Sequence, residues 1–451
     1  MKTKDKNPHE PSLSRRDFCK NTVILSSGLA LGTLSVQAAA HVYGDETIKV
    51  ALIGCGGRGT GAAAQALSTQ GKVQLVAMAD AFPDRLKESY DILSKKFAKQ
   101  PDKLKVTEDH KFVGFDAYTK AIPLADVVIL ATPPGFRPSH FEAAVKAGKH
   151  VFMEKPVATD APGVRKVLEM AKIAKEKKLN VVVGLQRHYQ RNYREVLKRL
   201  QEGNVGQIIS GQVYWNSDGV WVNPRKNGQT EMEYQMRNWY YFNWLCGDHI
   251  VEQHIHNIDV ANWFIGEYPS KAQGMGGRQI RTGKEFGEIF DHHFVEFEYP
   301  SGAVISSQCR HQPKTMSRVS ETFQGTQGRI TTDGGNLGMI TDLKGQVLYK
   351  HQGENDADPY QTEHDELFAS IRAGQVINDA EIGAKSTMTA IMGRMATYSG
   401  QTITWEEALN SEINLMPPQL AWDASPLSLP DENGFYKIAV PGKTNVLSYK
   451  D

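Results

Sequence analysis

The sequence predicts an α/β protein in which a doubly wound parallel sheet is followed by an α+β domain with a large open, mainly antiparallel sheet. Three observations lead to this fold class. Short apolar runs alternate with helical segments over residues 48–185, which is the rhythm of right-handed βαβ crossovers. A glycine-rich loop directly follows the first apolar run. Beyond residue 185, apolar and polar residues alternate instead, as in strands that have one solvated face.

The composition is that of an ordinary globular protein. The chain has 451 residues, of which 40% are hydrophobic and 23% charged, enough for two domains with full cores. Its formal net charge is +1. The charge therefore does not indicate binding to nucleic acid or to an anionic membrane. The four cysteines are widely spaced and indicate neither a disulfide framework nor a metal site.

Residues 1–40 have the order of an export signal peptide. The motif Ser14-Arg15-Arg16-Asp17-Phe18 precedes an apolar run over residues 22–36 that is short for a bilayer span. Paired arginines before Phe18 resemble the twin-arginine signal, whose machinery passes folded proteins. We therefore expect transient contact with that machinery and a periplasmic or otherwise exported mature protein without a membrane span. An ordinary Sec signal is the alternative.

The first domain is expected over residues 46–185. Its predicted strands cover residues 48–53, 73–79, 126–131, 150–153 and 180–185, and its predicted helices cover 60–67, 84–98, 139–147 and 161–177. Ligands of such a sheet bind at the carboxyl ends of the strands. The functional residues of this domain should therefore follow its strands.

The loop after the first strand has the pattern of a dinucleotide-binding turn. Gly54 would permit the tight turn, Gly56 the approach of phosphates, and Gly59 close packing of the helix. The helix N-terminus that follows suits a pyrophosphate. Asp80 ends the second strand, where it would accept hydrogen bonds from the adenosine ribose and favour NAD over NADP. A glycine-rich turn with Asp80 as a helix cap is the alternative.

The second domain is expected over residues 186–410. Predicted strands cover residues 208–215, 290–299, 303–308 and 329–332, and predicted helices cover 193–201, 361–373 and 382–398. Gly374 and Gly400 stand where helix C-caps would lie. The proline-rich residues 411–451 are expected to form an extended arm on the surface.

Three further motifs stand where strand ends should converge: Ala131-Thr132-Pro133-Pro134, Glu154-Lys155-Pro156, and the His-rich run from Asp248 to Asp259. Together with the glycine loop they resemble the motifs of the Gfo/Idh/MocA oxidoreductases, over nearly all of residues 46–410. The resemblance implies a Rossmann domain followed by a substrate and oligomerisation domain. It also implies activity on sugars, polyols and related alcohols, and assembly as a homo-oligomer.

The resemblance assigns roles to individual residues. Lys155 would be the active-site lysine, His256 the general base, and Glu252 the acid, where the family usually has Asp. The residues expected at the cofactor are Gly54, Gly56, Arg58, Gly59, Asp80, Thr132, Pro133, His140, Glu154 and Lys155. From residue types alone, since aromatic rings suit sugar faces and polar groups suit hydroxyls, the residues expected at the substrate are Gln186, Arg187, Arg237, Trp239 and Asp259.

The chemistry of alcohol oxidation suits these residue types. A base must take the hydroxyl proton while hydride moves to nicotinamide, and an imidazole does this near neutral pH. Lys155 can stabilise the developing oxyanion, and Glu252 can orient His256 or tune its pKa. We expect tightly bound NAD, loaded before export, because free NAD is scarce outside the cytoplasm.

Three alternatives stay open. Glu252, His254 and His256, with His292 and His293, offer oxygen and nitrogen ligands for a divalent metal, although the spacing is not diagnostic and we expect no metal. An NAD-dependent glycosidase would use transient oxidation and elimination with cofactor recycling. A binding or scaffold protein would keep a vestigial Rossmann fold.

Overall fold

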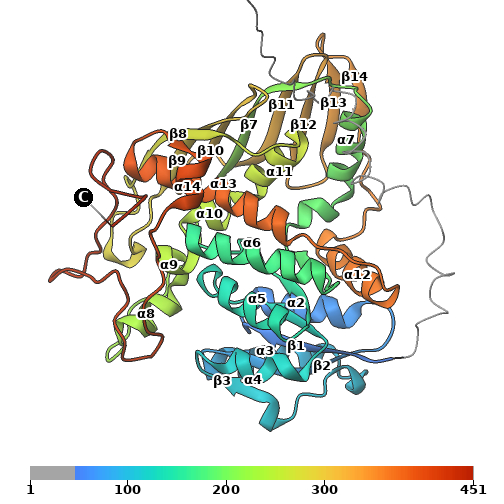
Figure 1. The fold of residues 1–451 in the computed structure, drawn as a ribbon, viewed down its shortest axis with the longest axis vertical. Coiled ribbons are helices and arrows are strands. Elements are labelled where there is room, and N and C mark those ends of the chain that lie inside the picture. The colour runs from blue at the N-terminus through green and yellow to red at the C-terminus, as the bar shows by residue number, and fades with distance from the viewer. Residues whose placement is uncertain (1–45, 450–451) are drawn as a thin grey trace, which may run out of the picture. The chain divides into compact units, whose positions relative to one another are not determined.

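The computed structural model describes residues 46–449, which contain two β-sheets (Figure 1). The predicted export signal over residues 1–40 lies outside the described residues. Within the described range, none of the helices is long and apolar enough to cross a membrane.

The first sheet has six parallel strands in the order β3-β2-β1-β4-β5-β6. The strands are β1 (Ile48–Ile53), β2 (Val73–Asp80), β3 (Lys111–Val113), β4 (Val127–Leu130), β5 (His150–Met153) and β6 (Val181–Val183). This order confirms the predicted doubly wound sheet. The order reverses between β1 and β4, and ligands of such sheets bind at that switch point.

Helices cover the first sheet because its central strands are apolar on both faces. All four residues of β4 are buried, for example, so water must be excluded from both sides. The helices of this part are α2 (Gly57–Ser68), α3 (Pro83–Lys96), α4 (Ala117–Ala121), α5 (Arg137–Lys146) and α6 (Ala161–Glu176). Helix α6 begins where the Asp160 carboxylate accepts from Gly163 N at 2.8 Å, a side-chain cap for a free helical N–H.

The second sheet has nine strands in the order β14-β13-β12-β11-β7-β10-β9-β8-β15. They are β7 (Ile208–Ser217), β8 (Lys271–Gly277), β9 (His292–Glu298), β10 (Val304–His311), β11 (Arg318–Gly325), β12 (Gly328–Asp333), β13 (Gly338–Asp342), β14 (Val347–Lys350) and β15 (Ile403–Thr404). Strands β7 and β10 pair in parallel, and the other neighbours pair antiparallel. The prediction of a large, mainly antiparallel sheet is confirmed.

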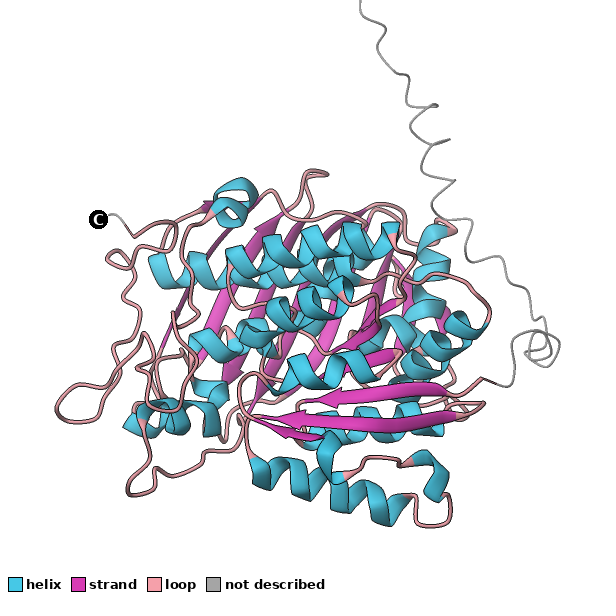
Figure 2. Ribbon diagram, turned by 60° about the horizontal axis from the view of Figure 1, so that its bottom comes forward, coloured by secondary structure: helices cyan, strands magenta, loops and turns pink. Residues whose placement is uncertain are grey.

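Helices pack against one face of this second sheet (Figure 2). The remaining helices are α7 (Arg191–Gln201), α8 (Glu231–Arg237), α9 (Asn243–Cys246), α10 (His249–Glu252), α11 (Ile255–Ile265), α12 (Pro359–Arg372), α13 (Ala380–Ser399) and α14 (Trp405–Asn410). Alternate residues of β9 are buried, as expected for a strand with one covered face.

Two late helices join the halves of the chain. Helix α12 packs on α2, and its Leu367 and Phe368 belong to the core of the first sheet. Helix α13 is buried over most of its length and packs on α6, β8 and β9. The residue ranges 46–185 and 186–410 therefore share one continuous core. Between α14 and residue 449 the described chain has neither helix nor paired strand longer than a single bridge.

Candidate active site

A cavity of about 710 Å³ opens at the carboxyl ends of β1, β2, β4 and β5 and extends to the second half of the chain. Most of the residues predicted for the cofactor and the substrate line it. These are Gly54, Gly56, Arg58, Gly59, Asp80, Thr132, Pro133, His140, Glu154, Lys155, Gln186, Arg237, Trp239, Glu252 and His256. Residues from four strand ends and three distant segments thus meet in one space.

The glycine loop has the shape that a pyrophosphate requires. Gly54 has a φ of +95°, and a Cβ there would lie 2.5 Å from the Ala131 carbonyl carbon. A Cβ on Gly59 would lie 1.9 Å from the Gly54 oxygen. Gly56 faces open space and is the N-cap of α2, which has no side-chain cap. The free N–H groups of this helix terminus therefore suit an anion, and the loop fits a dinucleotide.

Asp80 holds the glycine loop from the end of β2. Its Oδ2 accepts from Cys55 N at 2.6 Å, and its Oδ1 accepts from Phe82 N at 2.8 Å. Burial raises the pKa of this carboxyl, and the two backbone donors oppose the rise. A carboxylate oxygen accepts more than one hydrogen bond, so Asp80 can still receive a ribose hydroxyl.

Arg58 is tied to three side chains. Its Nε contacts Glu154, its Nη2 lies 2.9 Å from Glu363 Oε1, and its Nη1 donates to Gln65 at 2.8 Å. Burial lowers the pKa of Arg58, but the two carboxylates outweigh it and the net pKa is raised. Arg58 therefore links the glycine loop to α12, and no sequence signal pointed to its partner Glu363.

Arg137 joins the two motifs that follow β4 and β5. It is almost fully buried, and it donates from Nη2 to the Thr132 carbonyl at 2.6 Å and from Nε to the Glu154 carbonyl at 3.0 Å. Burial lowers its pKa to about 10. Burial and the Arg137 charge together lower the pKa of His140 to about 3, so that ring is neutral beside Thr132. Arg137 is not among the residues that the sequence motifs predicted for the site.

Lys155 and Glu252 both line the cavity and form an ion pair there. Lys155 Nζ donates to the Glu252 carbonyl at 2.6 Å and to Glu252 Oε1 at 3.1 Å. Among the described residues, Glu252 makes no hydrogen bond to His256. The expected contact between acid and imidazole is therefore replaced by one between acid and lysine, because Glu252 ends α10 whereas His256 belongs to the next helix.

His256 lies in the first turn of α11 and lines the cavity. Its ring stacks near Trp215, with centroids 5.9 Å apart. Its Nδ1 is buried without a hydrogen-bond partner in the described part of the chain, which leaves Nε2 for a ligand. Burial lowers its pKa well below the ordinary value, and the charges of Lys155 and Arg187 lower it further. The imidazole is therefore neutral, with Nε2 as the nitrogen that can face a ligand.

Two predicted substrate residues lie away from this cavity. Asp259 is buried, and its carboxylate bonds His188 Nε2 and Ser386 Oγ, each at 2.7 Å. Arg187 pairs with buried Glu321 and lines a separate, smaller cavity. By contrast, Arg237 reaches across to Asp84 at 2.7 Å and covers the Phe82 ring.

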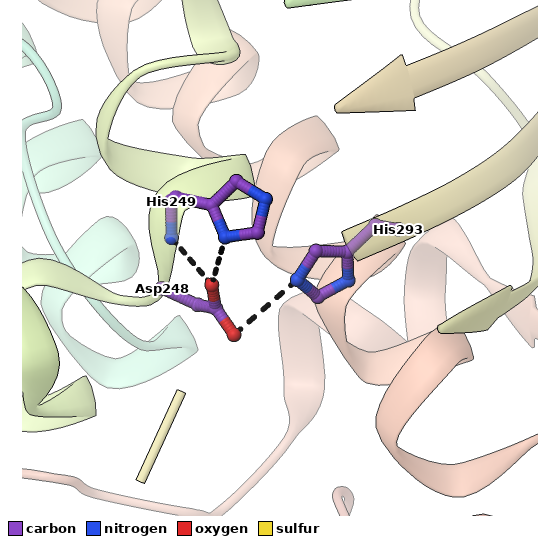
Figure 3. A group of neighbouring side chains, drawn as sticks. All are labelled: Asp248, His249 and His293. Atoms are coloured by element: carbon purple, nitrogen blue, oxygen red, sulfur yellow. Dashed lines mark hydrogen bonds and ion pairs between the residues drawn. The ribbon is translucent and has the colours of Figure 1, made fainter. Parts of the chain in front are cut away.

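The His-rich run does not form the metal site considered from the sequence. It is helical, so Glu252, His254 and His256 do not share a strand face. His254 Nε2 lies 2.8 Å from Ser307 Oγ instead. The structure gathers Asp248, His249 and His293 (Figure 3).

The Asp248 carboxylate of that group is already satisfied by hydrogen bonds, whereas Nε2 of His249 and Nε2 of His293 are buried without a hydrogen-bond partner among the described residues. Asp248 Oδ1 accepts from the ring and backbone nitrogens of His249. Its Oδ2 accepts from Phe290 N at 2.9 Å and from the Tyr398 hydroxyl, and lies 3.3 Å from His293 Nε2. A metal would have to displace these donors from a fully buried carboxylate. The arrangement fits a structural link between α10 and β9 better than a metal centre.

Two family models match the chain. One, described as an oxidoreductase family with an NAD-binding Rossmann fold, matches residues 48–185, and the GFO/IDH/MocA C-terminal domain matches residues 193–331.

Curated relatives and a solved structure agree with these matches. The chain is 27% identical over 240 residues to 2,7-anhydro-N-acetylneuraminate hydratase of Escherichia coli K12, covering 52% of this chain and only 59% of that protein. It is 26% identical over 294 residues to inositol 2-dehydrogenase of Rhizobium meliloti, covering 64% of this chain and 76% of that protein. The fold is similar to that of aldose-aldose oxidoreductase from Caulobacter crescentus, at a TM-score of 0.63 and 19% identity over 80% of this chain and 100% of that one. Because the two family matches together cover more than half of its residues, the chain belongs to the Gfo/Idh/MocA family of oxidoreductases.

Proposed function

We propose that this protein is an exported oxidoreductase that transfers hydride between tightly bound NAD and a secondary hydroxyl of a sugar, polyol or glycoside. The observation that carries the proposal is the single cavity shared by the glycine loop, Lys155 and neutral His256. The sugar or polyol class is supported by the inositol 2-dehydrogenase relative.

Different residues of the cavity would bind the cofactor, take the substrate proton and stabilise the developing negative charge. Gly54, Gly56, Gly59 and Asp80 would hold NAD, which when bound supplies the hydride acceptor. His256 Nε2 takes the proton of the substrate hydroxyl. Lys155, held in place by Glu252, donates a hydrogen bond to the same oxygen as negative charge develops there.

Retention of the cofactor is supported by the C-terminal arm. Trp422 packs on Phe82 and Phe115 with ring centroids 4.9 and 4.5 Å apart, and both phenylalanines line the cavity near Asp80. The arm is anchored where Leu415 N donates to Asp160 Oδ2 at 2.8 Å. We propose that the arm closes the adenosine end of the cavity, so that NAD loaded before export stays bound.

Replacing Trp422 with Ala is expected to release the cofactor about 10 to 100 times faster. Each aromatic pair contributes roughly 0.5–1.5 kcal/mol beyond its burial, and two pairs are lost. The loss of bound nucleotide during buffer exchange measures the effect. Leu429→Ala is the matched control, because Leu429 is an exposed residue of the same arm. Equal retention in both variants would refute the closing role of Trp422.

The proposed function is tested on protein purified from its host compartment without added nucleotide. Native mass spectrometry should find one NAD per chain, and added sugar should produce the near-ultraviolet absorbance of reduced nicotinamide. The same spectrum gives the subunit number, which we expect to exceed one. Recovery of cofactor-free protein that is fully active with micromolar added NAD would contradict the proposal that the cofactor stays bound.

Substituting both Arg15 and Arg16 by Lys should leave the protein in the cytoplasm.

A second candidate function is an NAD-dependent glycosidase, whose net reaction leaves the cofactor unchanged. It is favoured by the relative named as a hydratase. His256 and Lys155 would serve in it too, since transient oxidation of the sugar acidifies a neighbouring C–H. Product analysis separates the two functions. A keto sugar with net reduced cofactor supports the oxidoreductase, and a free hydrolysed sugar without it supports the glycosidase.

A further inference from the structure

A second cavity of about 380 Å³ adjoins the catalytic end of the first. Gln186, Trp215 and Tyr360 line both cavities. The far wall of the second cavity is made by Val319 of β11 and by the turn at Gly334 after β12. Because Trp215 also stacks near His256, the two spaces meet beside the proposed base.

The boundary between the cavities offers the contacts that sugars use. Trp215 is half-buried and Tyr360 is 38% exposed, so both rings present apolar surface to a ligand. Gln186 Oε1 is buried and lacks a hydrogen-bond partner among residues 46–449. A buried acceptor without a donor carries a free-energy cost, which a ligand hydroxyl would remove.

The charges around the second cavity favour a neutral occupant. Among residues 46–449, Arg187 is the only cation in its lining, and it is buried and paired with Glu321. Asp333 adds a carboxylate to the same lining. A phosphate or carboxylate ligand would need an uncompensated cation, and the described lining provides none. Arg187 Nε is buried and has no hydrogen-bond partner in the described chain.

We propose that this second cavity is a subsite for the second unit of a glycoside. It rests on the proposed function, and it narrows the substrate class to neutral glycosides about the size of a disaccharide. The ring that is oxidised lies at His256 and Lys155, and the linked unit passes between Trp215 and Tyr360 toward Gly334. The absence of a side chain at Gly334 helps to keep the subsite open.

Gly334 allows the subsite to be filled without a backbone clash. A Cβ there would lie 3.5 Å from both Arg187 Nη2 and Val319 Cγ1, which is ordinary contact. We expect Gly334→Phe to lower kcat/KM for a disaccharide at least tenfold, while kcat/KM for the methyl glycoside of its oxidised ring changes less than about twofold. Val319→Phe fills the cavity from a neighbouring position on the same wall and should act alike. Asn336→Phe, at an exposed position outside the lining, is the control.

The test compares disaccharides with the matching methyl glycosides in gluco, galacto and manno series. Reduction of the bound cofactor in a single turnover gives the rates. Binding to the His256→Ala variant is followed by tryptophan fluorescence, which needs no turnover. The subsite is supported if disaccharides bind more tightly than the matching methyl glycosides and if Gly334→Phe abolishes this difference. That result would support the subsite even if no sugar were oxidised, in which case only the proposed function would fail. The subsite would be overturned if disaccharides and methyl glycosides bound equally well, or if Gly334→Phe lowered kcat/KM equally for both.

Discussion

Replacing His256 with Ala is expected to lower kcat by about 10²–10⁴-fold, the usual contribution of a positioned general base. KM should change much less, because the imidazole acts on the proton in the transition state and not mainly on bound substrate. His256→Asn keeps a polar side chain of similar size and should be as slow. Added imidazole should restore part of the rate to the Ala variant. Equal losses in rate and in binding would contradict the base role.

The pH dependence follows from the lowered pKa of His256. Burial, Lys155 and Arg187 all disfavour the protonated ring, so the base stays neutral well into the acid range. We expect kcat/KM to be flat across neutral pH and to fall only at a pH well below about 6.5, the ordinary value for His. Because the unfolded chain binds this proton first, the same group also lowers folding stability as pH falls below about 6.5. An acid limb centred at or above that pH would show that another group is the base.

Replacing Lys155 with Met is expected to lower kcat by about 10²–10³-fold, the cost of losing one donor to a developing oxyanion. The variant also leaves the Glu252 carboxylate without its partner in a mostly buried position, which should lower the free energy of unfolding by about 1–3 kcal/mol. Single-turnover reduction of the bound cofactor and thermal unfolding of the holoenzyme measure the two effects separately.

Matched variants separate catalysis by Lys155 from its structural role. Glu252→Gln removes the charge of the pair but keeps the Glu252 carbonyl that Lys155 contacts at 2.6 Å, so it should cost much less activity. The double variant Lys155→Met, Glu252→Gln should recover stability without recovering rate. If rate and stability returned together, Lys155 would be only a structural residue.

The local features of the cofactor site could be predicted from the sequence because neighbouring residues create them. The turn of Gly54, Gly56 and Gly59 depends on backbone sterics within one loop, and the place of Asp80 depends on the length of one βα unit. Strand periodicity similarly predicted both sheets. The position of Lys155 next to the strand end of β5 followed from the same rule.

The pairings between distant residues could not be predicted in this way. Arg58 meets Glu363 across 305 positions, and Lys155 meets Glu252 across 97. Because the helix breaks between α10 and α11, Glu252 and His256 lie in different helices. Glu252 therefore pairs with Lys155 and not with His256. Arg187 and Asp259 are polar residues that could bind a sugar hydroxyl as Gln186 could, yet Arg187 forms an ion pair with Glu321 and Asp259 bonds His188 in the core instead.

The sequence alone therefore establishes the fold class, the dinucleotide loop and the residue types available for proton transfer, because sterics and periodicity act over short stretches of chain. Only the tertiary structure decides which of those groups share a cavity, which are consumed by internal ion pairs, and that a second cavity lies beyond Trp215. Those outcomes depend on how α12, α13 and the C-terminal arm pack against the first sheet, and packing between distant segments leaves no periodic pattern in the sequence.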